Sequence, residues 1–122
     1  MRVAGLGFRR GASAESLKAA LALVGEAQAL ATAEDKVAEP GFARLARELG
    51  LPVHAVSRAA LGAQGVEGSA RVMAEFGTGS VAEAAALAAA GPGARLVIGR
   101  RTGPDGMAVA AIAESLTAEG AT

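Results

Sequence analysis

Most apolar residues of this chain are small, and this restricts the folds it can form. Hydrophobic residues make up 52% of the sequence, but alanine supplies much of that share and the only aromatic residues are Phe8, Phe42 and Phe76. Small side chains bury little area each, so a stable core requires backbones that approach closely. We therefore expect helices packed tightly on a sheet through small contact residues.

Strand-like and helix-like patterns alternate along the sequence. Strands are expected at residues 2–8, 28–32, 52–56, 95–98 and 107–112, although the alanines of the last segment leave a helix as the alternative. This alternation predicts an α/β fold with a largely parallel or mixed sheet of about five strands. The length of 122 residues and the lack of a linker suit one domain spanning residues 1–122.

Capping residues mark where helices should begin. Ser13 suits an N-cap and Pro40 suits a first helical position, so one helix should follow each of them. Ser80 and Glu83 have the spacing of a capping box before a helix at residues 81–90. Between these segments we expect one helical turn at residues 57–61, a mobile loop around Gly62, Gly65 and Gly68, and a short helix at residues 69–76.

The composition argues against several classes of function. Basic and acidic residues number 12 each and Trp and Tyr are absent, so nothing indicates a nucleic-acid partner. The absence of cysteine excludes disulfides and thiolate chemistry. The first residues do not resemble a signal peptide, and the alanine-rich stretch 81–90 is too short to cross a bilayer. We therefore expect a cytoplasmic protein with no membrane partner.

Three glycines lie where the first strand should lead into the first helix. Gly5, Gly7 and Gly11 form a G-x-G-x-x-x-G spacing. A glycine turn at a helix start exposes N–H groups that favour phosphate or carboxylate, so we expect an anion there. The spacing is one residue longer than the dinucleotide-binding fingerprint, which weakens a nucleotide-binding interpretation. The alternative is that these glycines serve a tight turn and close packing of a helix on the sheet.

Two pairs of arginines follow expected strands. Arg9 and Arg10 follow the first strand, and Arg100 and Arg101 follow the strand at 95–98. If these strands are parallel, both pairs lie at one edge of the sheet, which is where open α/β folds bind ligands. Guanidinium groups bind carboxylates through two parallel hydrogen bonds. We expect each pair to contribute to binding an anion, and the alternative is a solvated basic surface.

Charged and hydroxyl side chains gather before the second helix. Thr32, Lys36 and Glu39 are candidates for ligand binding, with Lys36 as an electrostatic clamp and Glu39 as its orienting partner or a proton carrier. The alternative is a charged helix entrance capped by Glu39. Ser80 and Glu83 are explained by capping, although the same helix start could hold a ligand carboxylate.

Groups suited to catalysis are few. His54 is the only histidine, and a lone histidine in a strand is more often structural than catalytic. Lys36, Glu39 and His54 are therefore the only candidates for proton transfer, and the question whether the protein is an enzyme stays open. We find no cluster of metal-ligand residues, no P-loop lysine and no Ser/His/Asp order, so we expect neither a metal nor a cofactor.

An ordered set of short segments resembles a known family across nearly the whole chain. The segments are Gly5-Leu-Gly-Phe-Arg-Arg-Gly-Ala-Ser13, Thr32-Ala-Glu-Asp-Lys-Val-Ala-Glu39, Gly50-Leu-Pro52, Gly79-Ser-Val-Ala-Glu-Ala-Ala-Ala-Leu87 and Ala108-Val-Ala-Ala-Ile-Ala113. In this order they resemble the cobalamin-biosynthesis family that contains CobE and the C-terminal domain of CbiG. The length of the chain is similar to the stand-alone CobE form.

The resemblance implies a three-layer α/β/α domain that acts in the corrin pathway. The ligand would then be a tetrapyrrole, and a corrin intermediate with many peripheral carboxylates suits arginines and an apolar floor. The first hypothesis is an accessory or carrier that binds a precorrin or hydrogenobyrinic-acid-type intermediate and hands it to another corrin-pathway enzyme. The second is a corrin-ring hydrolase or lyase related to cobalt-precorrin-5A hydrolase, and the third is a nucleotide-binding regulatory domain.

Overall fold

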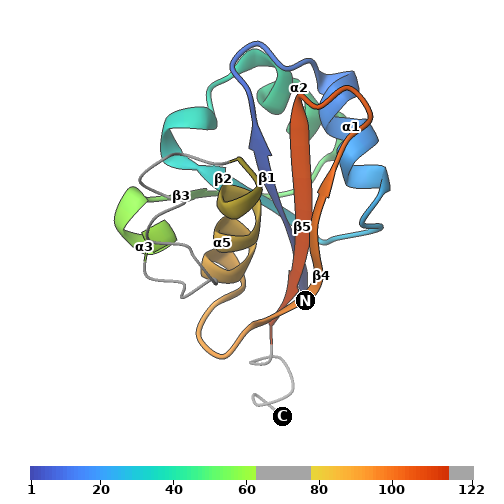
Figure 1. Ribbon diagram of the computed structural model, residues 1–122. Coiled ribbons are helices and arrows are strands. Elements are labelled where there is room, and N and C mark those ends of the chain that lie inside the picture. Colours follow the sequence, from blue (N-terminus) through green and yellow to red (C-terminus); the bar gives the residue numbers. More distant parts are fainter. Residues whose placement is uncertain (63–77, 116–122) are drawn as a thin grey trace.

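The computed structural model describes residues 1–62 and 78–115, which form a five-stranded sheet with helices on both faces (Figure 1). The strands are β1 (Arg2–Phe8), β2 (Ala29–Ala33), β3 (Val53–Val56), β4 (Arg95–Thr102) and β5 (Ala108–Glu114). The helices are α1 (Ala14–Ala22), α2 (Pro40–Leu49), α3 (Arg58–Gly62) and α5 (Thr78–Ala90), with a 3-10 turn, η1 (Glu34–Lys36). The loop expected around Gly65 and Gly68 and the helix expected at 69–76 lie outside the described residues.

The sheet is mixed, with the order β3-β2-β1-β5-β4. β1 pairs with β2 and β2 with β3 in parallel, whereas β5 is antiparallel to both β1 and β4. β4 therefore runs in the same direction as β1, two strands away from it. The expected mixed α/β sheet of five strands is confirmed, and the last segment is a strand rather than the alternative helix.

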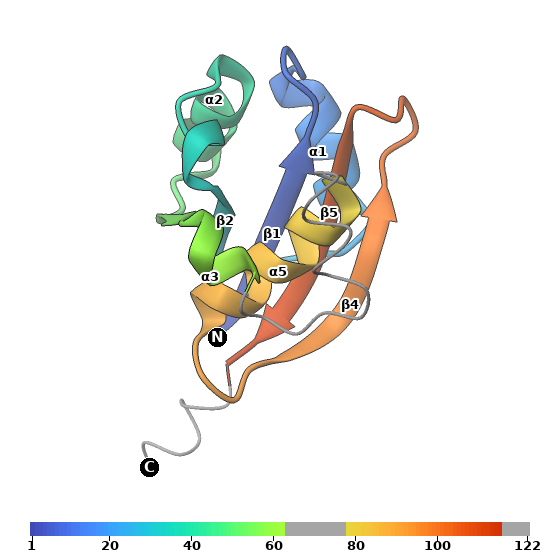
Figure 2. The ribbon, with the colours of Figure 1, turned by 60° about the vertical axis from the view of Figure 1, so that its left-hand side comes forward.

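Helices cover the two faces of the sheet in separate layers (Figures 1 and 2). On one face, α1 and α2 supply Leu17, Phe42 and Leu45 to a core that includes Leu6 and Ile112. On the other face, α3 and α5 supply Leu61 and alanines 84–86 to a core with Val3 and Val56. This arrangement is the three-layer α/β/α sandwich that the family resemblance implied. No helix in the described residues has the length and apolarity that crossing a bilayer requires.

The expected helix boundaries follow from capping chemistry. The Ser13 side-chain oxygen accepts the backbone N–H of Ser16 at 3.0 Å, which satisfies one free donor at the start of α1. Pro40 occupies the first turn of α2, where its missing N–H costs nothing. Gly50 ends α2 in the left-handed conformation with φ 66°. These local signals position α1 and α2 as the sequence indicated.

Two boundaries differ from expectation, and both move candidate residues. α5 begins at Thr78, so Ser80 lies inside the helix instead of capping it. β4 continues to Thr102, so Arg100 and Arg101 lie within the strand instead of following it. The extension is possible because the polar end of β4 is exposed on an edge strand, where arginine side chains remain in solvent.

The central contact of the fold is the close approach of α5 to β1. A Cβ atom at Gly5 would lie 2.0 Å from the carbonyl oxygen of Ala82 and 2.7 Å from the backbone nitrogen of Ala86. Ala82 and Ala86 are themselves fully buried. Only glycine on the strand and alanine on the helix allow the two backbones to approach this closely. The alternative stated for the glycines, close packing of a helix on the sheet, is thus correct for Gly5.

Asp105 ties the β4–β5 connection to α1. Its carboxylate accepts the backbone N–H of Met107 at 3.0 Å and the hydroxyl of Ser16. These hydrogen bonds hold the pKa of Asp105 below its ordinary value of 3.8, and the hydrogen bond from Ser16 has the larger effect. Asp105 therefore stabilises the turn between β4 and β5, and the same side chain also anchors the hairpin to the first layer of helices.

We predict that Gly5→Ala destabilises the protein by about 1–3 kcal/mol or more, because α5 must move away from β1 to admit a methyl group. Chemical denaturation monitored by circular dichroism measures this change. The matched control is Gly62→Ala, where an added Cβ meets no atom of the described residues within 4 Å, and it should change stability by less than about 0.5 kcal/mol. Equal effects of the two substitutions would contradict the packing argument.

Ser16→Ala should lower stability at neutral pH and matter less in acid. A carboxylate whose pKa is depressed in the folded state adds stability above its unfolded pKa, and this stability is lost as pH falls through the folded pKa. The wild type should therefore exceed the variant in unfolding free energy at about pH 7, with the difference shrinking below about pH 4. A difference that stays constant down to about pH 3 would show that the charge of Asp105 is not involved.

Candidate functional site

The carboxyl ends of the three parallel strands meet at one edge of the sheet. β1 ends at Phe8, β2 at Ala33 and β3 at Val56, and each is followed by a turn or helix. A cavity of about 790 Å³ opens there, at the edge where open α/β sheets bind ligands. Its described walls are Gly7, Phe8, Arg9, Arg10, Thr32, Ala33, Glu34, Asp35, Lys36, Val56, Arg58, Leu61 and Val81.

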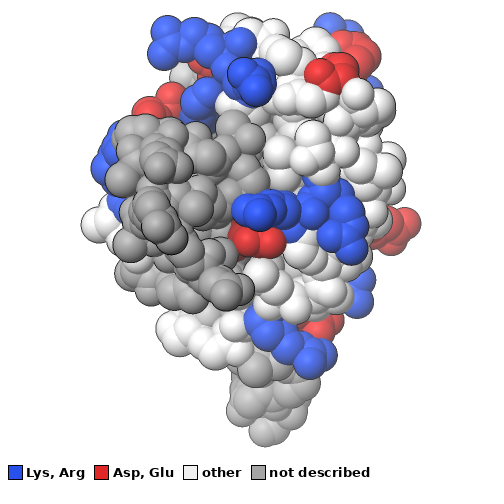
Figure 3. All heavy atoms as spheres, in the orientation of Figure 1, with Lys and Arg blue, Asp and Glu red and all other residues white. Residues whose placement is uncertain are grey.

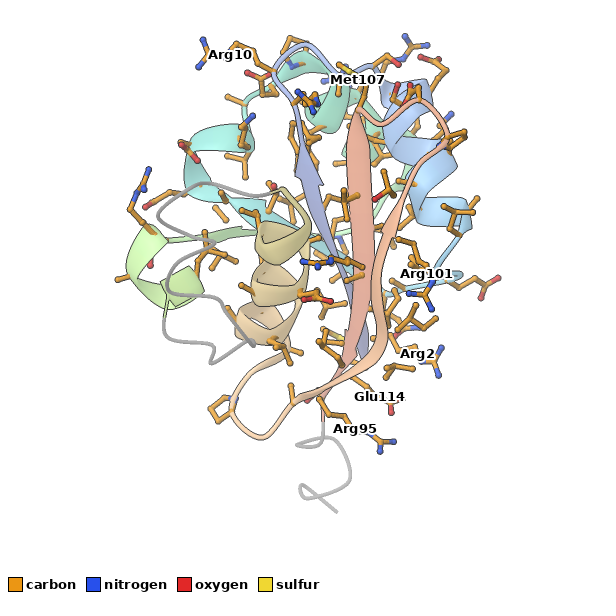
Figure 4. All side chains as sticks on the ribbon, viewed as in Figure 1. Arg2, Arg10, Arg95, Arg101, Met107 and Glu114 are labelled. Carbon is orange, nitrogen blue, oxygen red and sulfur yellow. The ribbon has the colours of Figure 1, made fainter. Side chains whose placement is uncertain are left out.

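The cavity has an apolar floor and a charged mouth. Val56 and Leu61 are buried in the core beneath α5, and Phe8 is buried on the other side of the sheet. Arg9 and Arg10 are exposed just beyond β1, and no carboxylate of the described residues forms an ion pair with either. Figure 3 shows basic side chains gathered over this end of the molecule, and Figure 4 places Arg10 there.

Lys36 reaches from η1 to the end of β1. Its Nζ atom donates a hydrogen bond to the carbonyl oxygen of Phe8 at 2.9 Å and lies 5.2 Å from the centroid of the Phe8 ring. The Phe8 ring in turn stacks on Phe42 with centroids 5.7 Å apart. An ammonium group has three donors, so Lys36 keeps others for a ligand while it holds the last residue of β1.

Glu39 contacts the loop after β1 and does not pair with Lys36. Its Oε1 atom accepts the backbone N–H of Gly11 at 3.2 Å, and no ion pair joins Lys36 to Glu39. Although Glu39 occupies the N-cap position of α2, its side chain makes no capping hydrogen bond. The structure therefore shows neither the expected pairing of Glu39 with Lys36 nor the stated alternative, capping by the Glu39 side chain. The nearby Gly11 N–H does meet an anion, but the anion is a carboxylate of the protein itself.

Thr32 joins β2 to β1 beneath the cavity. Its hydroxyl donates to the carbonyl oxygen of Leu6 at 2.7 Å, and the residue is 0% exposed. A buried hydroxyl needs such a partner, so this hydrogen bond accounts for a polar residue in the core. Thr32 lines the site from below, where its position is fixed by the strand.

The glycine pattern does not form a phosphate-binding turn. Gly5 and Gly7 both lie within β1, which is paired on both sides, by β2 and β5. Their place inside a central strand explains why the spacing misses the dinucleotide fingerprint, in which glycines shape the loop after the strand. Gly7 borders the cavity, and Gly11 adopts φ 85° in the loop. Among the three, only Gly11 has the turn conformation that was expected.

The second arginine pair lies away from the cavity. Arg101 of β4 is in register with Ala110 of β5, which in turn pairs with Leu6 of β1. Arg101 therefore lies level with Leu6, before the end of β1, and two strands or about 10 Å away from it. Its Nη1 atom donates to the carbonyl oxygens of Gly99 and Arg100 on its own strand. Figure 4 shows Arg101 well below Arg10, on the outer edge. The expectation that Arg100 and Arg101 follow a strand end beside Arg9 and Arg10 is wrong.

The remaining candidates are also separated from the cavity walls. Glu83 accepts the backbone N–H of Arg100 at 3.0 Å and so links α5 to β4. His54 lies half-buried on β3, in register with Ala31, and does not line the cavity. Lys36, Glu39 and His54, the three proton-transfer candidates, are thus not brought together at one point.

Sequence reasoning missed Arg58 as a wall of the cavity. It lies just beyond β3, with only Ser57 between, and Arg9 lies in a similar position just beyond β1. The signal that could have identified it is this shared position after a parallel strand. The sequence predicted only one helical turn at residues 57–61, so the position of Arg58 after a parallel strand was not recognised.

Comparisons with known proteins agree on one family. The chain matches the family described as cobalamin synthesis G C-terminus over residues 2–113, and a comparison with curated proteins gives no match. It is similar to the crystal structure of CobE, a protein from the cobalamin (vitamin B12) biosynthetic pathway, with 38% identity and a TM-score of 0.77 over 95% of this chain and 91% of that one.

A second solved structure shows the same likeness. It is the cobalamin biosynthesis protein chiG from Agrobacterium tumefaciens str. C58, with 37% identity, a TM-score of 0.74, and coverage of 95% of this chain and 99% of that one. The family match spans nearly all of the chain, and both structural relatives share its fold as well as more than a third of its residues. The chain therefore belongs to the cobalamin synthesis G C-terminus family.

Proposed function

We propose that this protein binds a carboxylate-rich corrin intermediate, of the precorrin or hydrogenobyrinic-acid type, in the cavity at the carboxyl ends of β1, β2 and β3. It would act as an accessory or carrier that passes the intermediate to another enzyme of the pathway. Membership of a cobalamin-synthesis family supports the choice of ligand class. The cavity supports the choice of site, because it is the place where the described residues combine apolar surface with several cations.

Among the described walls of the cavity, basic side chains outnumber acidic ones, and this observation carries the proposal. Arg9, Arg10, Lys36 and Arg58 line the cavity, against Glu34 and Asp35. Guanidinium groups suit carboxylates because they offer paired N–H donors in one plane. A ligand with several carboxylates around its rim would therefore gain from binding at this mouth.

The floor of the cavity suits the apolar part of such a ligand. Val56, Leu61 and Val81 provide aliphatic surface beneath the charged mouth. The volume of about 790 Å³ lies within the range of about 300–1,000 Å³ that is usual for small-molecule sites. A flat macrocycle could rest on this surface while its carboxylates face the cations.

The geometry favours binding over turnover. Lys36 is bonded to a main-chain carbonyl, Glu39 to a main-chain N–H, and His54 lies on the edge strand outside the cavity walls. General acid–base catalysis requires such groups within hydrogen-bond reach of the same substrate atoms. The hydrolase or lyase hypothesis therefore has less support than the carrier, and the nucleotide-binding hypothesis loses the glycine turn on which it rested.

We predict that Arg9→Gln combined with Arg10→Gln weakens binding of hydrogenobyrinic acid by at least about tenfold, because charge-assisted hydrogen bonds to carboxylates are lost. Titration followed by the visible absorbance of the corrin measures the dissociation constant. Arg100→Gln combined with Arg101→Gln is the matched control, since this double variant removes the same two charges from the distant edge strand. It should change affinity by less than about twofold when salt screens long-range effects.

The same experiment distinguishes the competing functions. Failure of the wild type to bind hydrogenobyrinic acid at tens of micromolar would remove the proposal. A change in mass of the corrin during incubation would favour the hydrolase or lyase, and equally strong binding of ATP or NADPH would favour a nucleotide site. Affinity that does not fall with added sodium chloride would contradict recognition by exposed arginines.

A further inference from the structure

We infer that Lys36 and Glu39 are positioning residues that brace the backbone on both sides of the Arg9–Arg10 pair. The inference rests on the proposed function of the cavity and deepens it. The two arginines follow Phe8 and precede Gly11, and these are the two residues whose backbones the Lys36 and Glu39 side chains bind. One short segment, residues 34–39, thereby holds the arginine-bearing loop at its beginning and at its end.

The upstream brace combines a hydrogen bond with ring contacts. Lys36 Nζ lies 2.9 Å from the Phe8 carbonyl oxygen and 5.2 Å from the centroid of the Phe8 ring. Because Phe8 is 2% exposed and stacks on Phe42, the atom that Lys36 binds is itself held by the core. The backbone therefore leaves β1 from a fixed point. The N–H of Arg9 donates to the carbonyl oxygen of Met107 at 2.9 Å, which extends the pairing of β1 with the β5 side of the sheet by one residue.

The downstream brace combines a hydrogen bond with close packing. Glu39 Oε1 lies 3.2 Å from the backbone nitrogen of Gly11, whose φ of 85° belongs to the left-handed region. The next residue of the loop, Ala12, touches the start of α2: a Cβ atom at Gly41 would lie 2.0 Å from the Ala12 carbonyl oxygen. The amino end of α2 therefore contacts the loop in two ways: through the carboxylate of Glu39 and through the backbone of Gly41, which has no side chain.

The two braces are mechanically connected. The N–H of Glu39 donates to the carbonyl oxygen of Lys36 at 3.1 Å, which closes the short turn between them. Across the loop, the N–H of Ala12 donates to the carbonyl oxygen of Arg9 at 3.0 Å. Both the bracing segment and the braced loop are thus compact turns, so the spacing of their contacts is set by backbone geometry.

Bracing matters because both arginine side chains are exposed and form no ion pair within the described residues. Ordering a free loop when a ligand binds costs affinity, and a loop fixed beforehand avoids that cost. Glu39 serves this role without lining the cavity, whereas Lys36 both braces the loop and lines the wall. Glu39 is therefore the residue whose substitution tests positioning alone.

The test compares Glu39→Ala with Glu39→Gln in two measurements. Both substitutions remove the charge, but the glutamine amide oxygen can still accept the Gly11 N–H. In the ligand-free protein, Glu39→Ala should raise hydrogen exchange at the Gly11 amide by roughly tenfold, as expected for a lost structural hydrogen bond, and Glu39→Gln should leave it near the wild-type rate. Affinity for hydrogenobyrinic acid should fall roughly five- to tenfold in Glu39→Ala and stay within about twofold in Glu39→Gln.

Each outcome decides the inference. Unchanged exchange at Gly11 in Glu39→Ala overturns it, and so does unchanged affinity in that variant while wild type binds. Equal losses of affinity in the alanine and glutamine variants would assign the effect to charge and also overturn it. If the wild type does not bind hydrogenobyrinic acid, the proposed function fails separately, and the exchange rates still decide whether Glu39 braces the loop.

Discussion

The contact between α5 and β1 determines how the rest of the molecule is arranged. At Gly5 the strand presents no side chain, so the helix backbone comes close enough that a single methyl group would overlap the carbonyl oxygen of Ala82. A helix held this close places Val81 at the wall of the cavity and Glu83 within hydrogen-bond reach of β4. The alanine-rich composition is therefore a requirement of the layer spacing, because larger side chains on α5 would separate the layers.

The topology of the sheet determines which charged residues can act together. Parallel pairing of β1, β2 and β3 brings three strand ends, and the residues after them, to one edge. β4 runs in the same direction as β1 but forms the far edge of the sheet, because β5 follows it in the sequence and pairs antiparallel between the two. Two similar Arg-Arg sequences therefore differ in position: Arg9 and Arg10 lie at the cavity, and Arg100 and Arg101 lie on an edge strand.

Local chemistry explains what could be predicted from the sequence. The limits of α1 and α2 could be inferred from single residues, because Ser13, Pro40 and Gly50 each act on the backbone of adjacent residues. The ends of β4 and α5 could not, since these depend on an edge of the sheet and on a contact with another element. The candidate site was predicted in part: its loop with Arg9 and Arg10 was identified and Arg58 was not. The partners of Lys36 and Glu39 could not be predicted, because they are set by tertiary contacts with Phe8 and Gly11.

The hydrogen bonds within the site also bear on what kind of activity it supports. Thr32, Lys36 and Glu39 each bind a main-chain group of β1 or the loop that follows it. The contacts of Lys36 and Glu39 are those inferred to hold the loop that carries Arg9 and Arg10. A proton-transfer group must be able to change its charge without loss of structure, and a side chain whose hydrogen bond holds a loop is poorly suited to that. Guanidinium groups, in contrast, stay charged throughout and bind without any change of protonation. The division of labour between bracing side chains and exposed arginines therefore suits a site that holds an anion better than one that transforms it.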